Sequence, residues 1–325
     1  MLLGAMFGAI SPAQATFPGR NGAIGFGGGF GCGFEVGAIG LIRPDGSQRR
    51  QVSACGDYWY GPVWSPDGRS FLAAGPHDIF RLRSDGSHQR RVTAGTMPSF
   101  APDGRHLVYA RGTNGRREIW RSRIDGRGAR RLRDRTPFAA NPIWSPQGDS
   151  IAYLQHKKGV WLIDARTGRL IRKLTKIEMF PLDWSPDGRR ILCARFSRGS
   201  LLGDPPADLY VVRADASGSV KRLTRTPDTS ESAAGWSPDG RRIVVLSTTE
   251  PVPGRARTTM VTMTTRLTRR HRIWTTPIYD PYDESLQLNV PIRAAWQPLP
   301  GGAAAERTRA RRIDSAVEPL TRLRN

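Results

Sequence analysis

The sequence has few of the residues from which metal and redox sites are usually built. Only three cysteines and five histidines occur in 325 residues, and the histidines are scattered. No C-x-x-C pair is present, which excludes a zinc ribbon or a thioredoxin-like motif. Apart from the N-terminus, no apolar run approaches the length that spans a bilayer. The scattered histidines are His77, His88, His106, His156 and His271. We therefore expect no metal, no cofactor and no transmembrane segment.

Lysine is also scarce. Only five of the 50 basic residues are lysine, so the net charge of +22 comes mainly from arginine. A charge of this size is typical of proteins that bind nucleic acid. The arginines, however, recur over the whole chain and do not gather in one stripe or tail. We therefore expect no nucleic-acid partner, and nucleic-acid binding through dispersed arginine is kept as a third hypothesis.

The first 15 residues resemble a secretory signal peptide, although a basic residue before the apolar run is lacking. The apolar run extends to Ile10, and Ala13-Gln14-Ala15 has the small-x-small pattern of a cleavage site. The alternative is a buried first strand. We expect cleavage and export, to the periplasm, the cell surface or the medium. Cys32 and Cys55 could then form a disulfide, whereas Cys193 lies in an alternating run typical of a buried strand.

A short motif recurs along the chain and predicts its architecture. It consists of an aromatic residue, Ser or Ala, Pro, Asp or Gln, and Gly, and successive copies lie between 36 and 60 residues apart. This spacing is typical of four-stranded propeller blades. A degenerate sixth copy is Trp296-Gln-Pro-Leu-Pro300. The repeated positions are Trp64, Asp67, Gly68, Phe100, Asp103, Gly104, Trp144, Gly148, Trp184, Asp187, Gly188, Trp236, Asp239, Gly240 and Trp296.

Each copy predicts a strand, a tight turn and a second strand, because Pro and Gly favour the turn. A second turn, such as Asp85-Gly86, separates two further strands, which gives the order A to D in each blade. The chain starts with strand B at residues 23–26 and ends with strand A at residues 294–296. Together these fragments complete one blade. We therefore predict an all-β, six-bladed propeller over residues 16–301 that is closed by its C-terminal strand.

Two groups of charged residues have alternative interpretations. The carboxylates Asp67, Asp103, Asp187 and Asp239 could form a metal or acid site, but Gln147 at the fifth equivalent position favours a role in the turn. Basic pairs on strand D, such as Arg90-Arg91, are interpreted as charged edges that prevent aggregation rather than as ligand contacts. The remaining residues, 302–325, are rich in arginine and predict a disordered or loosely helical tail.

These motifs resemble the TolB-type, WD40-like (PD40) propeller repeats, and the resemblance covers about residues 17–300. It implies the propeller fold and an exported, envelope-associated protein. TolB itself carries an α/β domain before its propeller, whereas here the propeller follows the predicted signal directly. Related propellers also cap prolyl oligopeptidase-type hydrolases, but no hydrolase domain fits into the remaining residues.

The sequence predicts binding rather than catalysis. It has no nucleophile elbow, H-E-x-x-H motif, Walker A motif or EF-hand loop. We expect a monomeric module that binds a protein or another envelope component. The alternative is a lactonase-like or lyase-like enzyme with a metal in the central channel, for which the starts of the inner strands offer only Asp183. Loop aromatics are the candidate contacts, with packing between blades as the alternative. They are Tyr58, Trp59, Tyr60, Phe138, Phe180, Tyr279 and Tyr282.

We predict a disulfide between Cys32 and Cys55, because both fall in loops on one face of the same blade. Closing a loop of this length could stabilise the fold by roughly 3 kcal/mol if the bridge is unstrained. Mass spectrometry of the non-reduced exported protein should find the linked peptides. Two free thiols at these positions would contradict the prediction.

Overall fold

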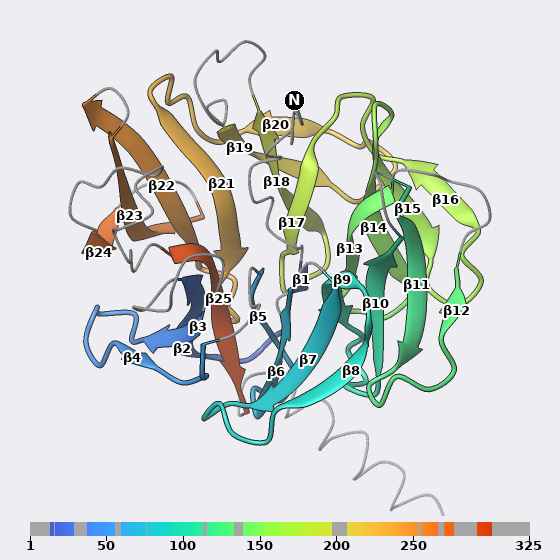
Figure 1. Ribbon diagram of the computed structural model, residues 1–325. Coiled ribbons are helices and arrows are strands. Elements are labelled where there is room, and N and C mark those ends of the chain that lie inside the picture. Colours follow the sequence, from blue (N-terminus) through green and yellow to red (C-terminus); the bar gives the residue numbers. More distant parts are fainter. Residues whose placement is uncertain are drawn as a thin grey trace, which may run out of the picture.

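The computed structural model describes residues 14–15, 17–28, 38–55, 60–75, 77–112, 116–132, 139–196, 207–252, 255–265, 270–275 and 291–300. Within these ranges every regular element is a β-strand. The strands form six sheets around a central axis (Figure 1). This confirms the predicted six-bladed propeller of four-stranded blades. None of the described segments contains a helix that could cross a membrane.

The four strands of each blade pair antiparallel, in order from an inner strand to an outer strand. Blade 1 consists of β25 (Pro291–Leu299), β2 (Arg20–Gly28), β3 (Ala38–Ile42) and β4 (Arg50–Gln51). Blade 2 consists of β5 (Tyr60–Trp64), β6 (Ser70–Ala74), β7 (Asp78–Arg83) and β8 (Arg90–Ala94). Blade 3 consists of β9 (Thr96–Phe100), β10 (His106–Arg111), β11 (Glu118–Arg123) and β12 (Arg130–Arg131).

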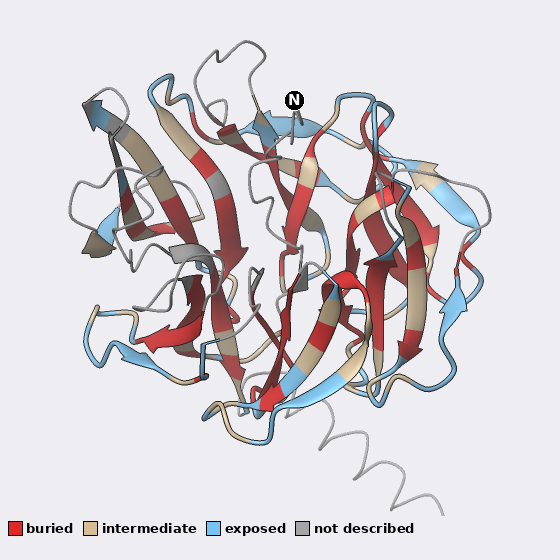
Figure 2. Ribbon diagram, viewed as in Figure 1, coloured by how far each residue is buried: buried red, intermediate tan, exposed pale blue. Residues whose placement is uncertain are grey.

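The other three blades follow the same order. Blade 4 consists of β13 (Ala139–Trp144), β14 (Ser150–Gln155), β15 (Gly159–Asp164) and β16 (Leu170–Lys173). Blade 5 consists of β17 (Phe180–Trp184), β18 (Arg190–Phe196), β19 (Ala207–Arg213) and β20 (Val220–Arg222). Blade 6 consists of β21 (Thr229–Trp236), β22 (Arg242–Val252), β23 (Arg255–Thr264) and β24 (His271–Thr275). Side chains of the inner strands are mostly buried, whereas the outer strands are mostly exposed (Figure 2).

The C-terminal strand closes the ring, as predicted. Strand β25 pairs antiparallel with β2 over seven residue pairs, with Trp296 opposite Ile24. A second contact lies at the same junction, where the side chains of Asn21 and Asp239 join blade 1 to blade 6. Asn21 Nδ2 donates to Asp239 Oδ2 at 3.0 Å, and the backbone N–H of Asp239 donates to Asn21 Oδ1 at 3.2 Å. Blade 1 therefore depends on both ends of the propeller sequence.

The repeated carboxylates serve the turns, as the Gln147 substitution indicated. In blade 2 the Gly68 N–H donates to the carbonyl of Ser65 at 2.9 Å, and Gly68 adopts φ of +67°. Asp67 Oδ1 accepts from Ser65 Oγ at 2.7 Å and from the Arg69 N–H at 3.0 Å. In blade 4, where Gln147 replaces the aspartate, Ser145 Oγ donates to Asp149 instead. The carboxylates are thus used by the local backbone.

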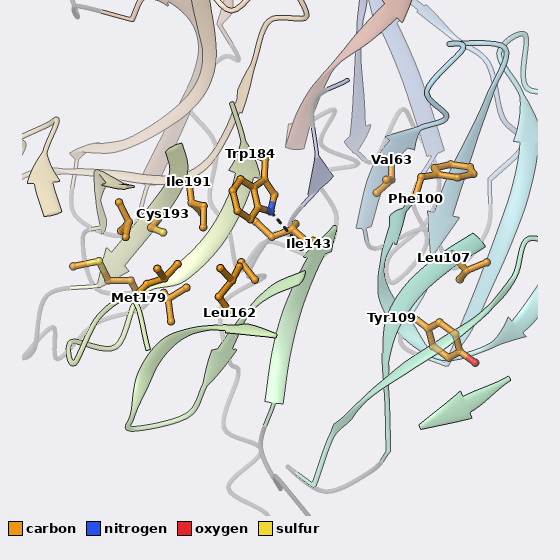
Figure 3. Packing of buried hydrophobic residues seen from close by; sticks show 14 of the residues in the cluster. Val63, Phe100, Leu107, Tyr109, Ile143, Leu162, Met179, Trp184, Ile191 and Cys193 are labelled. Atoms are coloured by element: carbon orange, nitrogen blue, oxygen red, sulfur yellow. Dashed lines mark hydrogen bonds between the residues drawn. The ribbon is translucent and has the colours of Figure 1, made fainter. Parts of the chain in front are cut away.

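The aromatic residue of each repeat packs in the core and joins neighbouring blades. All six are at most 3% exposed. The indole N–H of Trp184 donates to the carbonyl of Ile143 in blade 4 at 3.2 Å (Figure 3). Trp64 makes the equivalent bond to the carbonyl of Ala295 in blade 1, also at 3.2 Å. The repeated aromatic therefore supplies part of the hydrophobic core, and in blades 2 and 5 it also supplies a polar link to the preceding blade, whereas the indole N–H of Trp144 donates to Gly148 in its own turn.

The predicted cleavage motif lies close to the ring. Gln14–Ala15 form the short strand β1, which pairs in parallel with Asp183 and Trp184 of β17. Strand β1 lies among the inner strands in Figure 1. Blade 5 therefore has a fifth strand. Residues 302–325, the predicted tail, lie outside the described residues.

We expect the fold to depend on its last strand. A chain that ends at Arg293 loses Trp296 and most of the pairing partner of β2, which should lower the free energy of unfolding by at least about 3 kcal/mol. A chain that ends at Gly302 keeps β25 and should melt like the full chain, because residues 303–325 show little apolar periodicity. Thermal unfolding followed by circular dichroism distinguishes them. Equal melting temperatures for the two truncated chains would contradict closure by β25.

Candidate functional site

One face of the ring carries the loops that join strand B to strand C and strand D to the next blade. We call it the loop face. Of the predicted contact residues, Phe180 lies there at the start of β17, half-buried. Its ring meets Phe196 at the end of β18 edge to face, with 5.4 Å between centroids. Phe196 is also half-buried. The loop face of blade 5 therefore presents a pair of aromatic side chains to solvent.

The other predicted contacts are less fully described. Tyr60 belongs to β5 and pairs through its backbone with Ala74. Tyr58, Trp59, Phe138, Tyr279 and Tyr282 lie outside the described residues. Cys55 is disulfide-bonded, and Cys32 lies outside the described residues, so the identity of its partner stays a prediction. Cys193 is a buried free thiol, as predicted, and burial raises its pKa.

A charged network lies next to the aromatic pair. Asp208 is the second residue of β19, and it pairs across the sheet with Arg195 of β18. Its carboxylate forms an ion pair with Arg222 of β20. It also accepts a bond from the backbone N–H of Thr226 at 3.2 Å. Asp208 thus ties the outer strand of blade 5 to the segment that leads into blade 6.

Glu231 on β21 faces this network from blade 6. Its side chain is only 1% exposed, and Arg270 lies 3.8 Å away. The hydroxyl of Thr226 lies 3.4 Å from Glu231 Oε2 and 3.5 Å from Asp208 Oδ1, so the two carboxylates stand on either side of one hydroxyl group. Burial raises the pKa of Glu231, and the charge of Asp208 adds to this, while Arg270 and the threonine hydroxyls oppose it.

Comparison between blades shows which ion pairs recur around the ring and which residues occur in one blade alone. An acid at or next to the start of strand C forms an ion pair with an arginine of strand D in three blades. These pairs are Asp78–Arg91 at 2.8 Å, Glu118–Arg131 at 2.7 Å, and Asp208–Arg222. Asp208 is therefore the blade 5 form of a repeated device. Glu231 has no counterpart in that pattern, which makes it the residue most specific to this part of the loop face.

Glu231 was not predicted from the sequence, because no known motif contains it. It lies five residues before Trp236, within Thr-Ser-Glu-Ser. Only its position could have indicated a role: it is a carboxylate on a predicted inner strand, where the other blades have mostly apolar, glycine or proline residues. Among the described residues, no group of three or more His, Cys, Asp and Glu side chains comes together in a way that could hold a metal ion.

Asp183, the residue on which the enzyme alternative depended, is fully buried. Its Oδ2 accepts a bond of 2.6 Å from the backbone N–H of Trp236 in blade 6. Ser99 occupies the equivalent position in blade 3, and its hydroxyl accepts a bond of 3.1 Å from the backbone N–H of Trp144 in blade 4. The residue before the repeated aromatic thus joins one blade to the next, and serine can do this as well as aspartate.

The raised pKa of Glu231 predicts how stability depends on pH. The folded state holds the Glu231 proton more tightly than the unfolded state, so the free energy of unfolding should fall as pH rises from about 4.5 through the folded-state pKa. Glu231→Gln removes this dependence and should stabilise the protein at neutral pH. Urea unfolding at several pH values measures the difference. Asp228→Asn, which removes one exposed carboxylate on the same face, is the control, and parallel curves for wild type and Glu231→Gln would contradict the assignment.

Comparison with known proteins agrees with this architecture. Residues 39–179 match the family model of the TolB beta propeller domain, PD40. An uncharacterised protein of Agrobacterium fabrum is 29% identical over an alignment of 187 residues, and the match covers 50% of this chain and 63% of that relative. The chain therefore aligns with less than two thirds of the relative's length.

Two solved structures show the same fold. TolB from Acinetobacter baumannii has a TM-score of 0.62 at 19% identity, and the match covers 87% of this chain and 68% of TolB. An oligogalacturonate lyase in complex with manganese has a TM-score of 0.54 at 17% identity, covering 81% of this chain and 77% of the lyase. Likeness at such identities concerns the fold alone. With its repeated turns and its closed ring, this chain is a six-bladed β-propeller, and its residues 39–179 match the TolB beta propeller domain model, PD40.

Proposed function

We propose that this chain is a non-catalytic binding or scaffold module of the cell envelope, exported by its N-terminal segment. Its loop face captures a protein or another envelope component. The main support for the proposal is the structural role of Asp183, the candidate catalytic residue of the enzyme alternative. Its carboxylate accepts a backbone hydrogen bond that joins blade 5 to blade 6. A serine accepts the equivalent bond between blades 3 and 4, so the position does not require a carboxylate.

The composition of the loop face supports a binding role. Phe180 and Phe196 offer aromatic surface that is only half-buried. On the same face, Arg222 and Arg270 lie against the carboxylates of Asp208 and Glu231. Aromatic residues and arginine are the side chains that most often supply binding energy in protein interfaces. The rigid blades hold this surface in place, so a partner would meet it with little loss of conformational freedom.

An enzyme remains the second candidate, and the likeness to a lyase structure is the observation that favours it. That likeness concerns the fold. Catalysis in the channel would require Asp183 to give up its bond to Trp236 or to act from within a fully buried site. We therefore rank binding first.

The binding proposal predicts the effect of Phe180→Ala. Loss of an anchoring aromatic typically costs about 2 kcal/mol, or roughly thirty-fold in affinity. The full chain, immobilised and exposed to envelope extract, should retain a component that Phe180→Ala and Trp59→Ala retain much more weakly. Val220→Ala, which trims an exposed apolar side chain on the outer strand of blade 5, is the matched control. All three variants should keep the wild-type melting temperature.

Turnover would contradict the proposal. The full chain should release no unsaturated product from oligogalacturonate in the presence of manganese. Asp183→Asn, which retains an acceptor oxygen for the Trp236 N–H, should fold normally. Activity in the wild type that disappears in Asp183→Asn would establish the enzyme instead.

A large drop in the melting temperature of Phe180→Ala would contradict the binding role of Phe180, because it would show that the side chain packs in the core.

A further inference from the structure

Two neighbouring blades place arginine directly opposite arginine. Arg81 of β7 pairs with Arg90 of β8, and Arg121 of β11 pairs with Arg130 of β12. Three of the four side chains are exposed and Arg121 is half-buried. Like charges in directly opposed positions destabilise an antiparallel sheet. Folding alone therefore does not account for these pairs.

Protection of the outer edge does not account for them either. In the other four blades the residue opposite the equivalent basic side chain is apolar. These pairs are Leu41 with Arg50, Leu162 with Arg172, Val211 with Lys221, and Val261 with Arg272. One cation on the outer strand is enough to block unwanted strand pairing. The other arginine of each pair, Arg81 in blade 2 and Arg121 in blade 3, lies on strand C and therefore does not protect the outer edge of the sheet.

Among the described residues, the charge of Asp103 acts on Arg121 from a distance, but no acid forms an ion pair with any of the four opposed arginines. The adjacent Arg91 and Arg131 form ion pairs with Asp78 and Glu118. By contrast, Arg81, Arg90, Arg121 and Arg130 form no ion pair with a described residue. Burial, together with the charge of Arg130, lowers the pKa of Arg121. The four guanidinium groups therefore leave an excess of positive charge on the outer part of blades 2 and 3.

Neighbouring groups hold these guanidinium groups in position. Arg121 lies over the ring of Trp144 in blade 4, with its Cζ 5.2 Å from the ring centre. Arg130 Nη2 donates to the carbonyl of Arg166, also in blade 4, at 2.7 Å. Arg81 donates to Ser70 Oγ at 3.2 and 3.3 Å. Arginines that are already positioned lose less entropy when they bind an anion.

We propose that Arg81, Arg90, Arg121 and Arg130 form a surface that binds an acidic polysaccharide. We call these four residues the arginine surface. Guanidinium groups bind carboxylates through two parallel N–H bonds, and a carboxylate between two opposed arginines removes their repulsion. The same arrangement recurs at equivalent positions of adjacent blades. A polymer with a carboxylate on successive sugar units fits such a repeated site.

The chemistry of this surface favours a polyuronate over a nucleic acid. Single-stranded nucleic acid is usually bound by aromatic side chains on which the bases stack. Phe80 and Trp120 precede Arg81 and Arg121 in their strands, so they point to the opposite face of the sheet. A DNA duplex would have to bend to follow the convex outer side of the propeller, and this bending costs free energy. This inference concerns the outer strands and is independent of the loop face.

The test compares two double charge reversals. Arg90→Glu with Arg130→Glu changes the arginine surface, whereas Arg189→Glu with Arg241→Glu changes exposed arginines that follow the repeated turns of blades 5 and 6. Either pair lowers the net charge of +22 by the same amount. Affinity for alginate, a linear polyuronate, is measured by fluorescence anisotropy at physiological salt, with neutral dextran and oligo(dT) as further probes.

We expect the first pair to weaken alginate binding by at least about tenfold, and the second pair by less than about threefold. The first pair should also raise the melting temperature, since each glutamate then faces an arginine. If it fails to fold, Arg90→Gln with Arg130→Gln replaces it. Absence of alginate binding by the wild type would overturn the proposal, as would equal losses in both pairs. Tighter binding of oligo(dT), lost in the first pair, would identify a nucleic-acid partner instead.

Discussion

The pairing of β25 with β2 is the interaction on which the rest of the structure depends. A propeller blade has an inner and an outer edge, and a ring of blades is stable only if its first and last blades meet. Here blade 1 takes its inner strand from residues 291–299 and its other three strands from the N-terminal part of the chain. The two ends of the propeller sequence are thereby joined by a hydrogen-bonded sheet. Packing between separate blades would close the ring without any hydrogen bond between the two ends of the propeller sequence.

The contacts between blades extend that constraint around the ring. The indole groups of Trp64 and Trp184 donate to the preceding blade, while Asp183 and Ser99 accept from the following one. These bonds lie among buried apolar side chains, where an unsatisfied polar group would be costly. The parts of the inner strands that form these bonds therefore serve the structure. Surface that is free to vary remains on the loop face and on the outer strands, and both proposed binding surfaces are found there.

The sequence predicted the blades because the signals that define them are local. A turn that needs proline, aspartate and glycine within five residues can be identified without knowing what packs around it, and Gly68 adopts the positive φ that the pattern requires. The ring closure followed from the phase of the repeats. The roles of individual polar residues did not follow in this way. The bond from Trp236 to Asp183 joins residues that are 53 positions apart, so no spacing in the sequence reveals it.

Register explains the other features that the sequence left open. The pairing of β7 with β8 shifts between Ile79 and Phe80, and this shift brings Arg81 opposite Arg90. The basic pairs on strand D were predicted to protect sheet edges. The structure divides them into arginines that are paired with acids and arginines that face one another. Likewise, Glu231 becomes notable only once β21 packs beside the segment that contains Thr226.

Hydrogen–deuterium exchange of the backbone amides in β2 tests the closed ring most directly. The pairing with β25 and β3 predicts that Ile24, Gly25 and Phe26 exchange as slowly as Leu72 and Ala73 of β6, a strand in the same position of blade 2. Slow exchange in both strands, lost together as the protein unfolds, is the expected result. Fast exchange at Ile24 to Phe26 while β6 stays protected would show that β25 does not hold the ring closed.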